Sequence, residues 1–517
     1  MITLPNECHY AIFNNLRNNY KSLFSCALVN RQWCRIIIPI LWSEPEHHFK
    51  NPRLIRILLL TLNAEEQTLL IPFKIIPPSH PKPLFEYTSY ITSIKTYLYS
   101  GVRRWLNYER YKTGNCVENA IKCSLLAMFF RTSKNLKHLS LYEIICNPII
   151  FENLYKNTTV ISMHLYIVGG FKSEAMDKLV EFLDKNSTLT SLKLVSTQHN
   201  YEGVKTLLKS LNKNTVLNSL DLLNNKIGTE GGKVLAEFLC WNTTLISLSL
   251  INNYLGSVEG KALADALCKN STLTSLNLGS NNLGSEGGKA LANALYKNST
   301  LTSLYLRRNN LESEVGKALA DALYMNSTLT DLDLGYNNIG SEGGKALTNA
   351  LCKNKTLTSL NLSYNNFGPE GEIVLAGALC MNTSLKDLNL QSNKLGPGGG
   401  KALADALCKN TTLTSLNLSD NKLGSEGGKL LAGALCKNST LTSLFLGRNN
   451  LGSEGGIALA YTLCENTSLK NLDLHCNNIG SGGRALADAL SCNIIDSWCV
   501  HFEVLGLNLY NDDLYEQ

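Results

Sequence analysis

The sequence has no run of eighteen consecutive apolar residues, and its richest apolar stretch, residues 54–62, is interrupted by Arg56. A membrane-spanning helix needs about 20 such residues, so we expect none and no membrane partner. Residues 1–15 also lack the apolar centre of a secretory signal, because Pro5, Glu7 and His9 interrupt it. The expected location is therefore cytoplasmic, with the nucleus as a second compartment.

The chain also lacks a strong excess of either charge. Its 48 basic and 42 acidic residues give +6 over 517 residues, so nucleic acid is not an expected partner. The excess is local, because residues 1–135 contain 17 basic and 8 acidic side chains and the remainder contains 31 and 34. With 44% hydrophobic and 17% charged residues, the composition is that of a folding chain whose two parts differ.

Motifs for metals, cofactors and catalysis are missing. Sixteen cysteines include no Cys-x-x-Cys pair, and seven of them recur at multiples of 28 residues, too far apart for disulfides, so we interpret them as reduced, buried side chains. The nine histidines form no metal-binding motif, and Ala, Val or Leu follows each recurring Gly-Gly-Lys where a phosphate loop needs a hydroxyl. We therefore expect no cofactor, no metal and no catalytic residue, and hence no enzyme.

A 28-residue repeat dominates the rest of the sequence. The pattern L-x-x-L-x-L-x-x-N-x-L keeps strict register through eleven units whose first leucines run from Leu189 to Leu469, with looser copies from Leu136, Val160 and Val504. In the unit beginning at Leu273, alternating leucines predict a short strand, and the segment 289–295 predicts an amphipathic helix.

Other residues of that unit have predicted structural roles. Asn281 is expected to bond the backbone of neighbouring turns, Ser285 to cap the helix, and Asn298 to end it. One strand and one helix per repeat, stacked in parallel, predict an α/β fold. Its form is a right-handed horseshoe with strands inside and helices outside.

These repeats resemble the leucine-rich repeat family, and specifically its ribonuclease-inhibitor type, in which the repeat has about this length. The resemblance covers residues 136–517 and implies a solenoid of about fourteen repeats. It says little about function, because members of that class inhibit nucleases, stimulate GTPases, cap filaments or sense ligands.

The N-terminus has a different pattern. Leu4-Pro5 begins a helix with an acid at Glu7, and the segments 21–29 and 30–38 predict two further helices, with Pro39 ending or disturbing the third. Residues 3–48 resemble an F-box, with Asn30 where serine is common. The matching residues are Leu4, Pro5, Glu7, Ile12, Phe13, Leu16, Leu23, Cys26, Ala27, Leu28, Val29, Arg31, Trp33 and Trp42.

The F-box resemblance implies docking on the Skp adaptor of a cullin–RING ubiquitin ligase. The residues to which it assigns adaptor contact are Leu4, Pro5, Ile12, Phe13, Leu16, Val29 and Trp33. The alternative is a small helical cap that shields the first repeat. The predicted domains are residues 1–48 for the F-box-like unit, 49–135 for a mostly helical linker, and 136–517 for the repeats.

Candidate binding residues are those that break the repeat on its concave side, where most side chains are Ser, Asn or Gly. A first set occupies three repeats in sequence: Tyr305, Arg307, Arg308, Asp333, Tyr336 and Tyr364. A second set lies further along: Asp420, Phe445, Arg448, Asp473 and His475. Aromatic and arginine side chains are enriched at binding hot spots, although drift of surface residues also explains them.

Together these patterns predict the substrate-recognition subunit of a Skp–cullin–F-box ubiquitin ligase, whose repeats capture a protein target. One alternative is a non-catalytic leucine-rich-repeat scaffold or inhibitor with no role in ubiquitination. A GTPase-activating protein of the same repeat class is a third, but no residue stands out as its catalytic group.

Overall fold

The computed structural model describes residues 4–17, 19–45, 47–77, 86–142, 148–167, 173–196 and 201–492. The chain divides into two compact units, Met1–Ile227 with Thr244–Leu248 and Gly228–Thr243 with Ser249–Gln517. The division falls inside the repeats, because each repeat of a stack packs mainly on its neighbours. No helix of the described ranges is long and apolar enough to cross a membrane.

The first unit begins with three helices, α1 (Asn6–Asn15), α2 (Tyr20–Ala27) and α3 (Arg31–Ser43), and both α1 and α2 pack on α3. Their small core consists of Phe13, Leu23, Ala27, Ile37 and Ile40.

Pro39 does not end the third helix, which corrects the prediction from sequence. It lies inside α3, between the buried Ile37 and Ile40. A proline in a helix removes one backbone hydrogen bond at a cost of about 3 kcal/mol. Burial of the two isoleucines on the face that packs against the core offsets this cost.

Residues 49–135 contain helices and also the first strand of the sheet. The helices are α4 (Pro52–Leu59), α5 (Ala64–Thr68), α6 (Tyr97–Tyr108) and α7 (Asn115–Thr132), with single turns η1 (His47–Lys50), η2 (Ile71–Phe73) and η3 (Tyr87–Tyr90). Strand β1 (Ser93–Ile94) pairs in parallel with β2 (His138–Tyr142). The sheet therefore starts before residue 136, where the sequence pattern placed its first repeat.

The rest of the first unit alternates strands and helices, and its parallel strands follow chain order. The strands after β2 are β3 (Ser162–Ile167), β4 (Ser191–Ser196) and β5 (Ser219–Asp221), and the helices are α8 (Pro148–Lys156), α9 (Ser173–Lys185) and α10 (Tyr201–Leu211). Strand β6 (Ser247–Ser249) lies at the chain boundary of the two units.

The second unit repeats one short parallel strand and one helix. Its strands are β7 (Ser275–Asn277), β8 (Ser303–Tyr305), β9 (Asp331–Asp333), β10 (Ser359–Asn361), β11 (Asp387–Asn389), β12 (Ser415–Asn417), β13 (Ser443–Phe445) and β14 (Asn471–Asp473). Its helices are α11 (Gly228–Trp241), α12 (Gly256–Leu267), α13 (Gly284–Lys297), α14 (Glu312–Met325), α15 (Gly340–Leu351), α16 (Gly368–Met381), α17 (Gly396–Leu407), α18 (Gly424–Leu435), α19 (Gly452–Glu465) and α20 (Gly482–Cys492).

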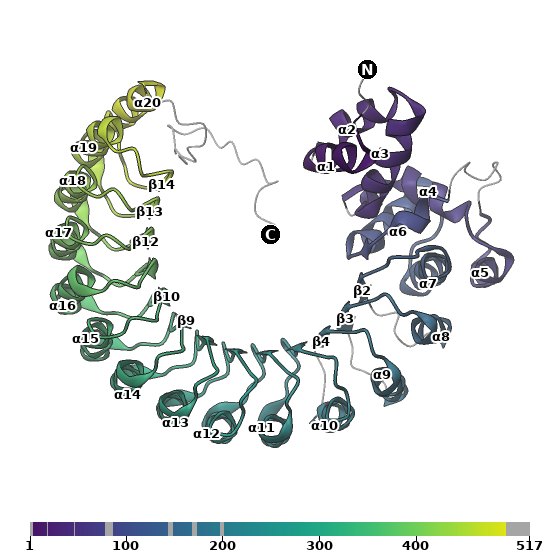
Figure 1. Cartoon of the computed structure of the whole chain (residues 1–517), viewed down its shortest axis with the longest axis horizontal. Coiled ribbons are helices and arrows are strands. Elements are labelled where there is room, and N and C mark those ends of the chain that lie inside the picture. The colour runs from purple at the N-terminus through teal and green to yellow at the C-terminus, as the bar shows by residue number, and fades with distance from the viewer. Residues whose placement is uncertain are drawn as a thin grey trace. The chain divides into compact units, whose positions relative to one another are not determined.

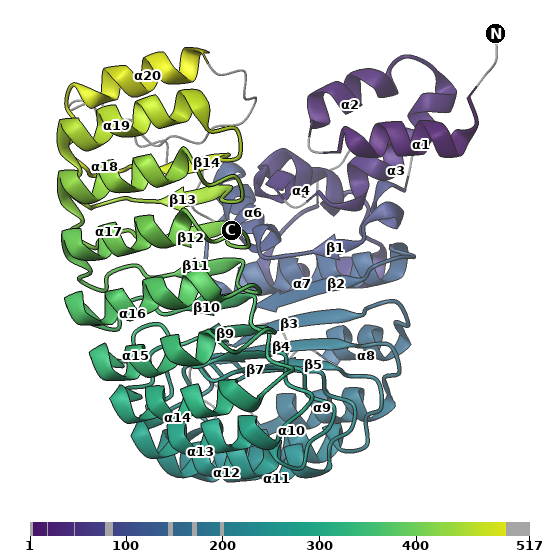
Figure 2. The same ribbon diagram turned by 60° about the vertical axis from the view of Figure 1, so that its left-hand side comes forward.

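Within this unit the strands line one side and the helices the other, as the fold class predicted (Figure 1), and the helices stack one on another (Figure 2). Paired strands keep the 28-residue register, as in Ser275↔Ser303 and Leu276↔Leu304. The leucines of the repeat are buried between the two layers, and Leu276 is fully inaccessible. The looser copy predicted from Val504 lies outside the described residues.

The start of each helix differs from the prediction. Ser285 does not cap its own helix; its hydroxyl donates to the Leu311 carbonyl oxygen and to Glu312 of the next repeat, at 3.1 and 2.8 Å. Most of these helices begin at a glycine with positive φ, such as Gly340 at +64°. The tight entry into the helix therefore depends on backbone conformation rather than on a capping side chain.

Candidate functional site

The N-terminal domain is held together by its aromatic core and by two asparagine caps. Phe13 is 3% exposed, and the Trp33 ring meets it edge-on at a centroid distance of 5.0 Å. The Asn19 and Asn30 side chains accept hydrogen bonds from the backbone N–H groups of Ser22 and Trp33, at 3.2 and 2.8 Å. Asn30, where the F-box pattern often has serine, thus performs a capping role for which serine is also suited.

Several apolar side chains of this domain remain exposed. We call Leu4, Ile12, Leu28 and Val29 the N-terminal apolar surface; their exposed fractions are 49%, 48%, 72% and 61%. The Gln32 side-chain amide donates to Asn6 at 2.9 Å, which ties the start of α1 to the start of α3. Leu4 and Pro5 directly precede Asn6 in the chain, and Leu28 and Val29 lie a few residues before Gln32. The chain segments that carry them are therefore neighbours.

The structure separates the seven adaptor-binding predictions into two groups. Leu4, Pro5, Ile12 and Val29 are exposed. The assignment of Phe13 to a contact surface is corrected, because its ring fills the core, and Leu16 and Trp33 pack partly buried against the same core. Leu28 was not among the predicted adaptor-binding residues, although it is the most exposed member of the surface.

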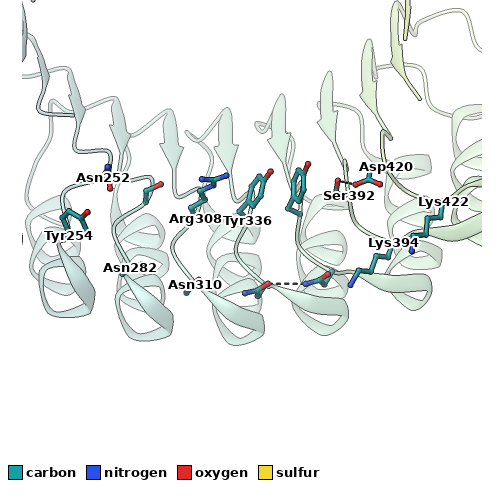
Figure 3. A pocket seen from close by; sticks show the side chains of 14 residues that line it. Asn252, Tyr254, Asn282, Arg308, Asn310, Tyr336, Ser392, Lys394, Asp420 and Lys422 are labelled. Atoms are coloured by element: carbon teal, nitrogen blue, oxygen red, sulfur yellow. Dashed lines mark hydrogen bonds between the residues drawn. The ribbon is translucent and has the colours of Figure 1, made fainter. Parts of the chain in front are cut away.

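The second unit carries a groove of about 850 Å³ along seven consecutive repeats. Two rows of side chains line it (Figure 3). The seventh-position row, counted from the first leucine of each repeat, is Asn252, Ser280, Arg308, Tyr336, Tyr364, Ser392 and Asp420. The ninth-position row is Tyr254, Asn282, Asn310, Asn338, Asn366, Lys394 and Lys422.

A buried asparagine between the two rows fixes their geometry. Asn337 is fully buried; its amide donates to the carbonyl oxygens of Leu306 and Leu334, at 2.9 and 3.0 Å, and its oxygen accepts from the Asn309 backbone N–H at 2.7 Å. The residues on either side of it, Tyr336 and Asn338, have φ of +59° and +55°. These left-handed conformations point both flanking side chains outward while the asparagine points in.

The same arrangement recurs in the other repeats, which confirms the predicted role of this asparagine. Asn281 donates to Leu250 and Leu278 and accepts from Asn253, at 2.8, 2.9 and 2.9 Å. The helix-ending asparagine was also predicted correctly. Asn298 follows α13 and donates to the Leu267 carbonyl of the previous repeat at 2.8 Å.

Four residues of the first predicted set form one stack. The Tyr336 and Tyr364 rings lie face to face at a centroid distance of 3.8 Å and an angle of 13°. The guanidinium groups of Arg307 and Arg308 lie 4.5 and 4.6 Å from the Tyr336 ring centroid. Stacking of this kind holds long side chains in place and reduces the entropy lost when a ligand binds.

The other two residues of that set are engaged within the sheet. The Tyr305 hydroxyl donates to Asp331 at 2.6 Å, and Asp333 accepts from the Gly335 backbone N–H at 2.8 Å. Burial raises the pKa of the Asp333 carboxyl, while the Gly335 N–H and the Arg307 charge oppose that shift. Neither Tyr305 nor Asp333 lines the groove.

The second predicted set lies on three consecutive repeats, and only Asp420 of it lines the groove. Asp420 belongs to the groove, where it accepts a hydrogen bond from Ser392 at 2.7 Å. Asp473 and His475 pair at 2.7 Å, and the His475 ring lies against the Gly447 backbone. Phe445 lies in strand β13 beside Asp473 of β14, and Arg448 is exposed with φ of +59°.

The ninth-position row was missed from the sequence. The predicted concave positions included only the strand residues and the first turn, and the residue between the asparagine and the last leucine was not among them. A signal was present, because that position is Asn, Lys or Tyr in each repeat of the groove. Asn in particular tolerates left-handed backbone. Among the described residues, no group of three His, Cys, Asp or Glu side chains is arranged to hold a metal. The predicted burial of the repeated cysteines is wrong, because none of the seven is buried and four of them, Cys268, Cys408, Cys436 and Cys464, are exposed.

The fold is thus an α/β solenoid of strand–helix repeats, preceded in the chain by a small all-α domain. Residues 1–47 match the F-box-like family model, so the chain is an F-box/leucine-rich-repeat protein. The leucine-rich repeat model matches nine segments: 213–236, 269–292, 297–320, 326–347, 353–376, 382–404, 409–432, 437–460 and 465–486.

Other comparisons are less informative. No curated protein matches the sequence. Actin-binding site 2 of leiomodin-1 is 28% identical, with 30% of this chain and 86% of that chain covered and a TM-score of 0.25. The Rad7–Elc1 complex of yeast is 18% identical, with 64% and 88% covered and a TM-score of 0.38.

Proposed function

We propose that this protein is the substrate-recognition subunit of a Skp–cullin–F-box ubiquitin ligase. The N-terminal domain docks on the Skp adaptor, and the repeats hold a protein target. The protein performs no chemistry itself. It raises the effective concentration of the target beside a separate ubiquitin-loaded enzyme.

The observation that carries the proposal is the N-terminal apolar surface within a domain that matches the F-box model. A domain of about forty residues has a small core and is only marginally stable, so the exposure of Leu28 and Val29 forgoes hydrophobic stabilisation that the domain lacks elsewhere. Burial of one such side chain contributes about 1.5–3 kcal/mol. Exposure of this kind is typical of a surface that a partner covers.

Co-purification with the Skp adaptor tests the proposal. The variant Leu28→Glu/Val29→Glu changes only exposed side chains, so the domain should keep its fold while losing the adaptor. The matched control is Met381→Glu/Tyr461→Glu, which places the same charges on exposed apolar residues of the repeats, 67% and 74% accessible. The control should retain the adaptor.

The alternatives predict a different result. A leucine-rich-repeat scaffold or inhibitor whose N-terminal helices only cap the solenoid would not capture the adaptor, even as the wild-type protein. A GTPase-activating protein would accelerate hydrolysis through a specific side chain. Failure of the wild-type protein to capture the adaptor would lead us to the scaffold hypothesis.

A further inference from the structure

The groove of the second unit presents many hydrogen-bond donors but only one negatively charged acceptor. Its charged side chains are Arg308, Lys394, Lys422 and Asp420. Asp420 is the single acid among the lining residues, and the Ser392 hydroxyl already bonds it. A ligand that complements this lining is therefore rich in acceptors and negatively charged.

The stack at its centre favours carboxylates over flat aromatic groups. One face of the Tyr336 ring meets Tyr364, and Arg307 and Arg308 also stack on this ring, so no flat group can insert there. What remains available is the edge of the stack. An arginine that lies flat on a ring still has N–H groups in its plane, and these suit a carboxylate. Figure 3 shows Arg308 beside Tyr336 at the rim of the groove.

A second cationic cluster lies further along the same groove. Lys394 and Lys422 are exposed, and neither forms an ion pair within the described ranges. Three repeats separate Arg308 from Lys394, which at about 4.8 Å per strand places the two clusters about 15 Å apart. An extended chain covers this distance with four or five residues. Exposed Asn338 and Asn366 lie between the clusters and can bond a peptide backbone.

We propose that this groove binds an extended acidic segment of a partner protein, running across the repeats. One acidic pair meets Arg308 and the tyrosine edges, and a second pair, four or five residues away, meets Lys394 and Lys422. The inference deepens the proposed function, on which it rests, by naming the chemical class of the target.

Fluorescence anisotropy with the full chain tests the inference. The probe is fluorescein-labelled Glu-Glu-Ser-Gly-Ser-Glu-Glu, compared with the peptide in which glutamine replaces each glutamate and with labelled oligouridylate. We expect saturable binding of the acidic peptide, weakened by salt. The variant Lys394→Gln/Lys422→Gln should lower its affinity by about two- to twenty-five-fold, because each exposed ion pair contributes about 1.4- to fivefold.

The matched control is Lys409→Gln/Lys437→Gln, which removes the same charge from exposed lysines just beyond helices α17 and α18. It should bind the peptide as the wild type does. Equal loss in both variants, equal binding of the glutamine peptide, or tighter binding of oligouridylate would each overturn the inference. So would the absence of saturable binding up to about 1 mM peptide.

The two measurements distinguish failure of this inference from failure of the proposed function. Wild-type protein that captures the Skp adaptor but not the peptide would refute the acidic target and leave the ligase role standing. Wild-type protein that binds the peptide but not the adaptor would refute the ligase role and leave the groove chemistry standing.

Discussion

Replacement of Asn337 by alanine should destabilise the repeats strongly, because this buried side chain joins two neighbouring turns. The Asn309 backbone N–H donates to its oxygen at 2.7 Å and would lose that acceptor. The carbonyl oxygens of Leu306 and Leu334 would each keep one donor, since Asn309 and Asn365 also bond them. One buried unsatisfied N–H costs about 1–3 kcal/mol, and each lost bond adds about 1 kcal/mol.

With one unsatisfied N–H and two lost bonds to carbonyl oxygens, the expected loss for Asn337→Ala is about 3–5 kcal/mol. The adjacent Asn338→Gly is the matched control, because Asn338 is exposed and glycine accepts its φ of +55°. Urea unfolding and hydrogen exchange of residues 301–365 would measure both variants. Similar stability of the two variants would refute the proposed structural role of the buried asparagine. Because Asn337 lies between Tyr336 and Asn338, its loss should also weaken peptide binding in the groove.

Three further outcomes follow from single residues. Glu312 begins α14 at φ +64°, where most other repeats have glycine, so Glu312→Gly should raise the thermal midpoint even though the Ser285 bond is lost. Gly340→Ala, at the same φ with open space around it, should cost about 1 kcal/mol in thermal unfolding. Glu259 is 2% exposed, and burial raises the pKa of its carboxyl, so the folded state binds this proton more tightly than the unfolded chain. The free energy of unfolding should therefore fall as the pH rises from the ordinary pKa of a glutamate to the raised pKa of Glu259. Glu259→Gln should remove this fall, whereas the control Glu286→Gln, at an exposed position, should leave it unchanged.

The architecture was predictable because the repeat is local and redundant. The leucines, the strand alternation and the buried asparagine each perform one physical task in every unit, so eleven copies confirm one another. Strand β1 was not predicted, since Ser93–Ile94 carries no repeat pattern and is recognised only by its pairing with β2. Pro39 was misread because its local penalty is visible in sequence, while the burial of Ile37 and Ile40 that offsets it is not.

The site was predictable only in part, for a related reason. Sequence periodicity indicates which side chains point away from the core, and it correctly predicted that Arg307, Arg308, Tyr336 and Tyr364 lie together. It does not tell which of them a neighbouring repeat engages, as Asp331 engages Tyr305. In the N-terminal domain, the family pattern alone does not distinguish residues that build the core, such as Phe13, from those that remain exposed.

The affinity between the full-length protein and the purified Skp adaptor tests the central proposal most directly. Titration calorimetry should give saturable one-to-one binding for the wild type. Leu28→Glu/Val29→Glu should weaken it at least a hundredfold, since two buried side chains contribute about 3 kcal/mol or more. Met381→Glu/Tyr461→Glu should bind as the wild type does. Absence of wild-type binding, or unchanged affinity after the change at Leu28 and Val29, would contradict the proposed docking.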